Sequence, residues 1–373
     1  MFGNRVKGRF RRFLLLKDRM MCRLTRGRIA KLPYPPMHIA VMVTGACTNQ
    51  CVFCCHHSED SKNDPVSKHL YNLQFSISYD DFCKIVNMAY DARVPHVHVV
   101  APGEPFLHRD IIKMLDYVIQ KYGEVSFQSN FDKKIFEKND YVNAIIERGD
   151  HISYITTDIL SSDPAIHEKI KKGSNFEYLL EVMQKINKKT DILFDLHLIL
   201  TKYNYRHMDR LVELLHERGI KFRFSIVNLH PHNFNDFTSS EAVYKSDDVE
   251  MRKELNKVKD VCEKLGVQVS VPMPFDKKAS KCGVFWSRLQ TIPSWDIPRE
   301  KWIGNTVQGD CNAVVKGKMR SFGNILDYDN LFDLWNNETL VKIRRDLING
   351  KYPDEECKNC QNYLDTSEQK GKR

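Results

Sequence analysis

The chain has 373 residues, of which 42% are hydrophobic and 28% are charged. This balance is typical of a soluble globular protein with one large domain and a smaller one. No apolar stretch approaches the roughly 20 residues that a membrane-spanning helix needs, and no segment resembles a secretory signal. Eleven cysteines without an export signal favour a reducing compartment, the cytoplasm, where thiols serve metals more often than disulfides.

The excess of basic over acidic side chains lies in an N-terminal segment, residues 1–36. The remaining residues after position 31 hold 46 basic and 47 acidic side chains, so they contribute almost no net charge. Residues 1–31 contain a single acid, Asp18, among eleven basic residues: Arg5, Lys7, Arg9, Arg11, Arg12, Lys17, Arg19, Arg23, Arg26, Arg28 and Lys31.

Apolar residues recur in this segment at mostly helical spacing: Phe2, Val6, Phe10, Phe13, Leu14, Met21 and Leu24. The pattern predicts a basic amphipathic helix. Such a helix either lies on an anionic membrane surface, here the inner face of the membrane, or packs on the rest of the chain with its basic face in water. A nucleic-acid partner is disfavoured because no recognisable nucleic-acid-binding motif accompanies the charge.

An apolar run over residues 37–43 predicts a buried strand, and a loop with three cysteines follows it directly. Cys47, Cys51 and Cys54 have the spacing C-x3-C-x2-C, which arises by chance in only about 1% of chains with this cysteine content. A cubane iron–sulfur cluster has four irons, so three thiolates leave one iron open to a small molecule. We therefore interpret the three cysteines as ligands of such a cluster.

Strands and helices then alternate along the chain. Five further apolar runs predict strands at 96–100, 125–128, 152–157, 192–200 and 222–227. Helical patterns cover 79–93, 110–121, 141–148, 178–187, 207–218 and, beyond the last strand, 250–265. This alternation implies an α/β fold with parallel strands, whose carboxyl ends carry the chemistry in barrel folds. The cysteine loop follows the first strand at that end.

These features together resemble the radical S-adenosylmethionine (SAM) superfamily. Its C-x3-C-x-aromatic-C loop matches Cys47, Cys51, Phe53 and Cys54, and the resemblance extends over about residues 37–230. It implies a six-unit (β/α)6 partial TIM-like barrel. It also implies that the open iron binds SAM, that one electron from the 4Fe–4S cluster cleaves SAM to methionine and a 5′-deoxyadenosyl radical, and that a flavodoxin or ferredoxin donates the electron.

The resemblance further implies where SAM is held. Gly103 and Glu104 match a Gly-Gly-Glu-Pro-like segment, in which glycine permits close approach and the carboxylate faces the SAM ammonium. Pro102 replaces the first glycine of that segment. The other expected SAM contacts are Phe53 in the loop, Ser129 and Asn130 after the third strand, Thr157 and Asp158 after the fourth, and Lys171, near a position that is often arginine.

Four cysteines follow residue 280: Cys282, Cys311 and the C-x2-C pair Cys357 and Cys360. Four thiolates suit either structural zinc or a fully ligated 4Fe–4S cluster, and their spacing does not distinguish the two. The surrounding segments, residues 282–286, 309–311, 321–325 and 331–335, resemble the SPASM and twitch extensions of the same superfamily. A full SPASM region has seven cysteines for two auxiliary clusters, so the four here favour one auxiliary 4Fe–4S cluster.

The predicted organisation has four parts: the basic segment 1–36, a radical SAM partial barrel at 37–250, a linking helix and strand at 251–280, and a small SPASM/twitch-like iron–sulfur domain at 281–373. The resemblance predicts a radical SAM oxidoreductase or epimerase that abstracts hydrogen from a substrate carbon. The product radical then loses an electron to the auxiliary cluster, which is oxidation, or regains hydrogen, which is epimerisation. The sequence singles out no catalytic base or hydrogen donor.

Relatives with this extension modify peptides, sulfatase side chains, aminoglycosides and other sugars. Only 46 residues precede Cys47, which leaves little room for a peptide-binding domain. We therefore expect a sugar-like or lipid-linked small molecule as substrate. Two alternatives stay open: a maturase that modifies a ribosomal peptide, and a non-catalytic iron–sulfur or zinc scaffold.

Overall fold

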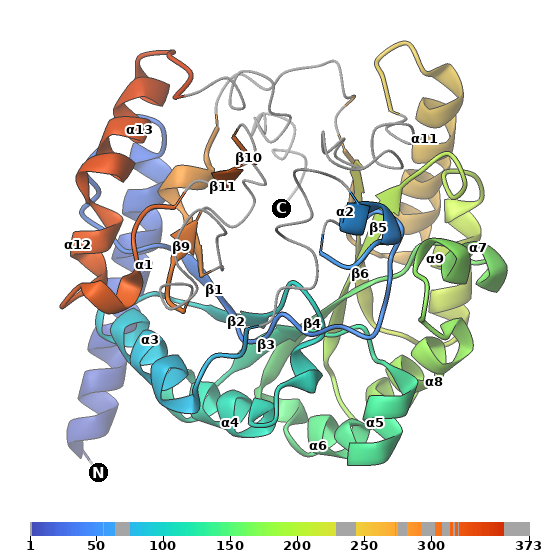
Figure 1. The fold of residues 1–373 in the computed structure, drawn as a ribbon, viewed down its shortest axis with the longest axis horizontal. Coiled ribbons are helices and arrows are strands. Elements are labelled where there is room, and N and C mark those ends of the chain that lie inside the picture. The colour runs from blue at the N-terminus through green and yellow to red at the C-terminus, as the bar shows by residue number, and fades with distance from the viewer. Residues whose placement is uncertain are drawn as a thin grey trace. The chain divides into compact units, whose positions relative to one another are not determined.

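A mainly parallel sheet organises the chain (Figure 1). The computed structural model describes residues 2–54, 56–63, 75–228, 244–272, 274, 282–291, 303–307, 314–315, 318–319 and 321–353. The hydrogen-bonded order of the strands is β7-β6-β5-β4-β3 in one unit of the chain and β1-β8-β9 in the other. The chain divides into a terminal unit, made of Met1–Met42, Ile77–His98 and Lys278–Arg373, and a central unit, made of Val43–Ser76 and Val99–Lys277.

The central unit alternates strands with helices. Its strands are β3 (Val125–Gln128), β4 (Ile152–Asp158), β5 (Leu193–Leu200), β6 (Phe222–Asn228) and β7 (Val269–Ser270). Each neighbouring pair from β3 to β7 is parallel. Its helices are α2 (Glu59–Asn63), η2 (Pro105–Leu107), α4 (Ile111–Tyr122), α5 (Lys133–Asn139), α6 (Tyr141–Glu147), η3 (Gly149–His151), α7 (Pro164–Ile170), α8 (Phe176–Asn187), α9 (Met208–Glu217) and α11 (Val249–Leu265).

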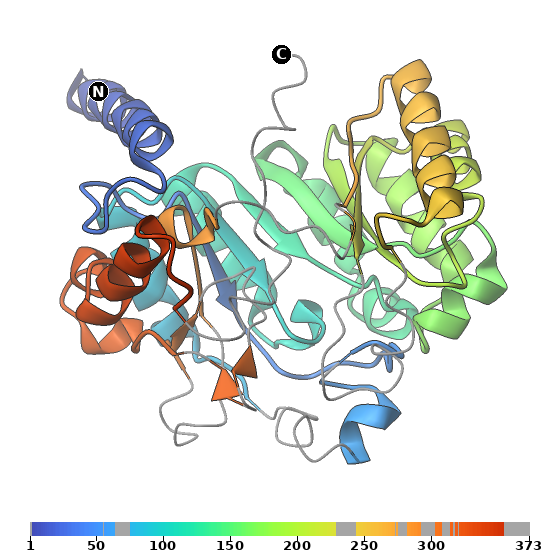
Figure 2. The same cartoon turned by 90° about the horizontal axis from the view of Figure 1, so that it is seen from above.

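The two faces of these strands differ in character. In β5 the side chains of Phe194, Leu196, Leu198 and Leu200 are fully buried, and helices α4 to α9 and α11 lie along one side of the strands in Figures 1 and 2. Because successive side chains of a strand point to opposite faces, the intervening residues of β5 face away from that apolar layer. Those residues include a carboxylate and an imidazole, which belong to the site described below.

The terminal unit gathers both ends of the chain. Its elements are α1 (Phe2–Thr25), β1 (His38–Met42), α3 (Tyr79–Asp91), η4 (Val284–Trp286), β8 (Arg288–Thr291), β9 (Thr306–Val307), β10 (Val314–Val315), β11 (Lys318–Met319), η6 (Ile325–Asp327), α12 (Leu331–Trp335) and α13 (Glu338–Ile348). The boundary between the two units falls within β2 (Val97–Val100), after His98. β8 pairs in parallel with β1, and β9 is antiparallel to β8.

A buried arginine holds the two ends of the chain together within this unit. Arg344 is fully buried and donates to the carbonyl oxygens of Phe285 at 2.8 Å, Trp335 at 2.8 Å and Ala30 at 3.2 Å. Its guanidinium also lies 4.3 Å from the centre of the Trp335 ring. Carbonyl groups that would otherwise be buried without donors are thereby satisfied.

The predicted α/β class with parallel strands is confirmed. The six expected strands are present as β1 to β6, and their bounds differ from the prediction by at most one residue at each end. The strand β7 lies within the predicted linking segment 251–280. Several elements were not predicted: the helices α2, α5, α7, α12 and α13 and the strands β8 to β11. Within the described residues no helix has the length and apolar character required to span a bilayer.

Candidate functional site

The cysteine loop is fastened to the central unit on both sides. Before the cysteines, Val43 N donates to Val100 O at 3.0 Å and Gly45 N donates to Phe75 O at 3.0 Å. Between and after the first two cysteines, Gln50 N donates to Lys172 O at 2.8 Å and Val52 N donates to Ile170 O at 3.0 Å. These bonds attach the loop to the ends of β2 and α7.

The strongest steric restriction in this region is at Gly103. A Cβ added there would lie 2.0 Å from the carbonyl oxygen of Ala46 and 3.0 Å from Cβ of Cys47. The next residue, Glu104, donates its N–H to the same Ala46 carbonyl at 2.8 Å. Only glycine permits this approach. The structure thus shows a close approach of Gly103 to the cysteine loop, and its predicted contact with SAM stays a prediction.

Glu104 is completely buried, and its carboxylate organises the end of β3. One oxygen accepts from Phe106 N at 3.0 Å, the other accepts from Asn130 N at 2.5 Å, and the Ser129 hydroxyl donates to the carboxylate at 3.1 Å. Burial raises the pKa of Glu104 to about 7, although these donors and the Lys171 ammonium act in the opposite direction. The structure thus brings together three of the residues predicted to contact SAM.

Two further predicted residues lie at the end of β4. Lys171 is completely buried, and its ammonium donates to the main-chain oxygen of Asp158 at 3.0 Å. Its charge also stabilises the ionised forms of Cys47, Cys51 and Glu104. Lys171 therefore lies within electrostatic reach of the cysteine loop while its side chain is held by β4.

Some polar side chains here are buried without a partner in the described part of the chain. Thr157 is 1% exposed, and its hydroxyl has no hydrogen bond. The amide of Asn49, within the cysteine loop, is likewise buried with both polar atoms unsatisfied. Buried polar atoms normally have partners, so these two groups fit a site that a polar ligand completes. Phe53, the aromatic residue of the loop, is half-buried.

The thiolate forms of the loop cysteines are unfavourable unless a positively charged group lies beside them. Burial raises the pKa of Cys47 to about 11, against the effect of the Asn49 and Thr48 N–H groups. Burial also raises the pKa of Cys51, and the charges of Cys54 and Cys47 add to this. Iron would offset these unfavourable charges. The Asn130 amide donates to Cys47 Sγ at 3.9 Å, and His56 N donates to Cys54 Sγ at 3.4 Å.

Within the described ranges no three His, Cys, Asp or Glu side chains converge as ligands of a single metal ion would. A cubane cluster makes no such demand, because each of its thiolates ligates a different iron. Of the four cysteines predicted to ligate an auxiliary cluster, Cys282 is described and half-buried. Cys311, Cys357 and Cys360 lie outside the described residues, so the auxiliary site stays a prediction.

A charged cluster on β5 and β6 was missed by the sequence reasoning. Arg223 donates to Asp195 Oδ2 at 2.6 Å, and His197 Nε2 lies 3.7 Å from Asp195 Oδ1. His197 is the register partner of Asp158. Burial lowers the pKa of His197, but the Asp195 and Asp158 carboxylates outweigh burial and raise that pKa above its usual value. The only sequence signal was the alternation of charged with apolar residues inside predicted strands.

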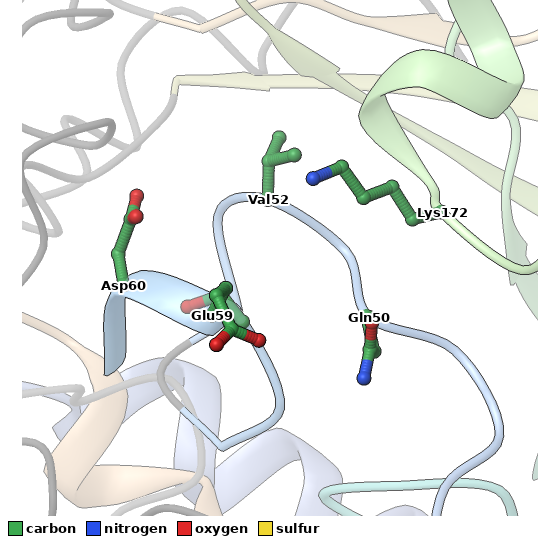
Figure 3. Close-up of a pocket in the computed structure, with 6 residues that line it drawn as sticks. Gln50, Val52, Glu59, Asp60 and Lys172 are labelled. Carbon is green, nitrogen blue, oxygen red and sulfur yellow. The ribbon is translucent and has the colours of Figure 1, made fainter. Parts of the chain in front are cut away.

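The outer side of the cysteine loop forms a small hollow (Figure 3). In the figure the ammonium of Lys172 faces the Val52 side chain across it. The lining residues are Gln50, Val52, Ser58, Glu59, Asp60 and Lys172, none of which is a predicted SAM contact. The hollow therefore shares no lining residue with the predicted SAM contacts.

We expect Gly103→Ala to displace the cysteine loop, because the new methyl group would overlap the Ala46 carbonyl. The free energy of unfolding should fall by about 1–3 kcal/mol, a typical cost of overpacking, and iron bound after anaerobic reconstitution should fall by more than half. Gly149→Ala is the control, because its Cβ would meet only the Thr190 side chain, 2.5 Å away and remote from the loop. Full iron content in Gly103→Ala would contradict the expected displacement.

A second prediction concerns the pH dependence of the metal-free protein. The pKa of Glu104 is about 7 in the folded chain and 4.5 as the ordinary value. A carboxyl with a raised pKa stabilises the fold below its ordinary pKa and loses that contribution as the pH rises through the folded value. The melting temperature of the wild type relative to Glu104→Gln should therefore fall between pH of about 4.5 and about 7. A constant difference across this range would refute the assignment.

The comparisons with known proteins give one family match and matches to solved structures. A model of the radical SAM superfamily matches residues 41–215. SuiB of Streptococcus suis bound to S-adenosylmethionine aligns at a TM-score of 0.63, with 17% identity over 86% of this chain and 70% of SuiB. A histidine-tagged form of anSMEcpe with bound AdoMet aligns at 0.59, with 16% identity over 88% of this chain and 86% of anSMEcpe.

A search of curated proteins finds no match. At these identities the structural likenesses establish the fold, and they agree with the predicted partial TIM-like barrel. The family model covers the cysteine loop, the Gly103–Glu104 segment and the strand ends of β3 and β4. The family match identifies residues 41–215 as a radical SAM domain.

Proposed function

We propose that this radical SAM enzyme abstracts hydrogen from a carbon of a sugar-like or lipid-linked small molecule, for oxidation or epimerisation. The observation that carries the proposal is the cysteine loop itself, which is attached by Gly103 and Glu104 to one strand end and by Ile170 and Lys172 to α7. When bound at Cys47, Cys51 and Cys54, the 4Fe–4S cluster supplies the electron that cleaves SAM to methionine and a 5′-deoxyadenosyl radical.

The residues around the loop have distinct roles in this proposal. Glu104 holds Ser129 and Asn130 in place and offers negative charge to the SAM ammonium. The unpartnered Thr157 hydroxyl is available to a polar group of SAM at the end of β4. Lys171 is fixed on Asp158 and offers positive charge to the SAM carboxylate. Phe53 contributes an apolar contact beside the third cysteine.

A polar substrate is supported by the cluster of Asp195, His197 and Arg223. Asp195 is buried, and its Oδ1 has no hydrogen-bond partner in the part of the chain that the structure describes. Arg223 presents a guanidinium beside it. A sugar hydroxyl both donates and accepts hydrogen bonds, so it complements a surface that offers a carboxylate acceptor and cationic donors. We place this substrate-binding surface on the face of β5 and β6 that lacks the apolar side chains.

A peptide substrate is the second candidate. SuiB has been solved bound to its precursor peptide SuiA, and anSMEcpe with bound AdoMet and the Cp18Cys peptide. The same polar face suits a peptide backbone as well as a saccharide. Mass spectrometry of a mixed peptide and glycolipid pool, incubated anaerobically with SAM and reductant in D2O, separates the two: the substrate is the class whose members lose two hydrogens, as in oxidation, or exchange one carbon-bound hydrogen for deuterium, as in epimerisation.

The Cys51→Ala variant tests the class of activity. Loss of one thiolate leaves the cluster without its third protein ligand, so 5′-deoxyadenosine formation should fall below about 1% of the wild-type rate. Cys83→Ala is the matched control, since Cys83 is another half-buried cysteine, on α3, and it should keep full activity. Continued SAM cleavage by Cys51→Ala, or none by the reconstituted wild type, would reject the enzyme in favour of the scaffold alternative.

We also propose that residues 281–373 hold one auxiliary 4Fe–4S cluster on Cys282, Cys311, Cys357 and Cys360. Cys357→Ala should lower the iron content from about eight to about four atoms per chain. SAM cleavage should continue in this variant without product formation, because the auxiliary cluster is assigned to the substrate oxidation. About four irons and one zinc in the wild type would instead assign these cysteines to zinc.

We propose that the enzyme works in the cytoplasm, where a flavodoxin or ferredoxin donates its electron. If the substrate is lipid-linked, the enzyme works at the inner face of the membrane. A contact between residues 1–31 and an anionic lipid surface is part of this proposal.

A further inference from the structure

The last three turns of α1 are fixed in the terminal unit by one face of the helix. Asp18 is 3% exposed and accepts from Arg93 Nε at 3.0 Å. One turn later the buried Cys22 thiol donates to the Trp286 carbonyl at 3.5 Å. Thr25, a further turn along, contacts the Tyr34 hydroxyl. The spacing 18, 22, 25 defines a single helix face, so the rotation of α1 about its axis is set by these contacts.

A second face of α1 is apolar and open to solvent. Phe13 is 63% exposed, Leu16 64%, Met20 55% and Leu24 57%. Their spacing of three, four and four residues forms one stripe along the helix. At about 100° per residue this stripe lies roughly opposite the face of Asp18, Cys22 and Thr25. Leu14 and Met21, by contrast, are half-buried and lie towards the packed face.

Cations border the stripe on both sides. Lys17 lies along one edge, and Arg19 and Arg23 lie along the other, all three exposed. Figure 2 shows the N-terminal turns of α1 extending away from the other elements of its unit. The helix therefore presents to solvent a row of large apolar side chains between two rows of positive charge.

We infer that this face of α1 docks on an anionic lipid surface. Nucleic acid would pair with the cations and leave the apolar stripe in water. A bilayer with anionic headgroups matches both features, because the stripe enters the headgroup and acyl boundary while the cations meet lipid phosphates. The alternative that α1 packs on the rest of the chain applies to the face of Asp18 and Cys22, and it does not account for the exposed apolar stripe. The inference rests on the lipid contact of the proposed function and assigns that contact to one face of α1, and it does not depend on the radical chemistry.

Vesicle sedimentation with the full, anaerobically reconstituted chain tests this docking. The enzyme should bind vesicles that contain about 30% phosphatidylglycerol in phosphatidylcholine, and should bind pure phosphatidylcholine at least about tenfold more weakly. Raising the salt from about 0.1 M to about 0.5 M should release it. No sedimentation with the anionic vesicles would overturn the inference.

Two variant sets locate the binding surface. The triple change Leu16→Gln, Met20→Gln and Leu24→Gln removes most of the stripe, and Lys17→Gln with Arg19→Gln and Arg23→Gln removes the bordering charge. Each should weaken binding to anionic vesicles about tenfold or more. Val249→Gln, at an apolar residue that is 72% exposed on α11, is the control and should leave binding unchanged. Unchanged binding by either triple variant would reject α1 as the docking surface.

Other occupants give distinct results in the same preparations. A dimer in light scattering that the apolar triple variant abolishes, without vesicle binding, would assign the stripe to a second copy of the chain. Salt-sensitive DNA retention without vesicle binding would assign the basic edges to nucleic acid. SAM cleavage measured on each variant should match the wild type, so failure of lipid docking is distinguished from failure of the proposed chemistry.

Discussion

The close contact between the cysteine loop and the Gly103–Glu104 segment is the constraint on which the site depends. Three thiols, of which Cys47 and Cys51 have raised pKa values, must be held near one another before any metal is present, and nothing in their own chemistry favours that arrangement. The main chain imposes it instead. The Ala46 carbonyl accepts from Glu104 N, and the absence of a side chain at Gly103 lets the two segments approach. Without this contact the loop would keep its hydrogen bonds to Val100, Phe75 and the α7 side, but it would lose its attachment at Ala46, next to Cys47.

The same segment links the cysteine loop to the strand ends. Glu104 is adjacent to Gly103 in sequence, and its carboxylate binds Ser129 and Asn130 after β3. Asn130 in turn donates to Cys47. A carboxylate buried among neutral donors has a raised pKa, and a cation bound beside it would favour its ionised form. Glu104 therefore has two roles: the sequence predicts that it faces the SAM ammonium, and the structure adds that it holds Ser129 and Asn130 in place.

The sequence predicts the elements that depend on neighbouring residues, and it misses those that depend on contacts between residues distant in the chain. Long and mostly apolar runs such as residues 192–200 predict a strand on their own, because every second residue supplies one continuous apolar face. β7 and β8 have two and four residues, too few for any periodicity, and they form strands only because β6 and β1 offer them hydrogen bonds. Asp195 and His197 were read as part of an apolar strand. Their pairing with Arg223 depends on a register that the sequence does not contain.

The helix α1 illustrates the same limit and its consequence for experiments. Helical spacing grouped Leu14 and Met21 with Phe13 and Leu24, but contacts to Arg93 and Trp286, distant in sequence, decide which side is buried. Arg344 joins Ala30, just after α1, to Phe285 and Trp335. Deleting residues 1–31 would therefore remove contacts that the C-terminal residues need, and lost binding would have two explanations. Substitutions on the exposed stripe leave those contacts intact, so only they isolate what the outer face of α1 does.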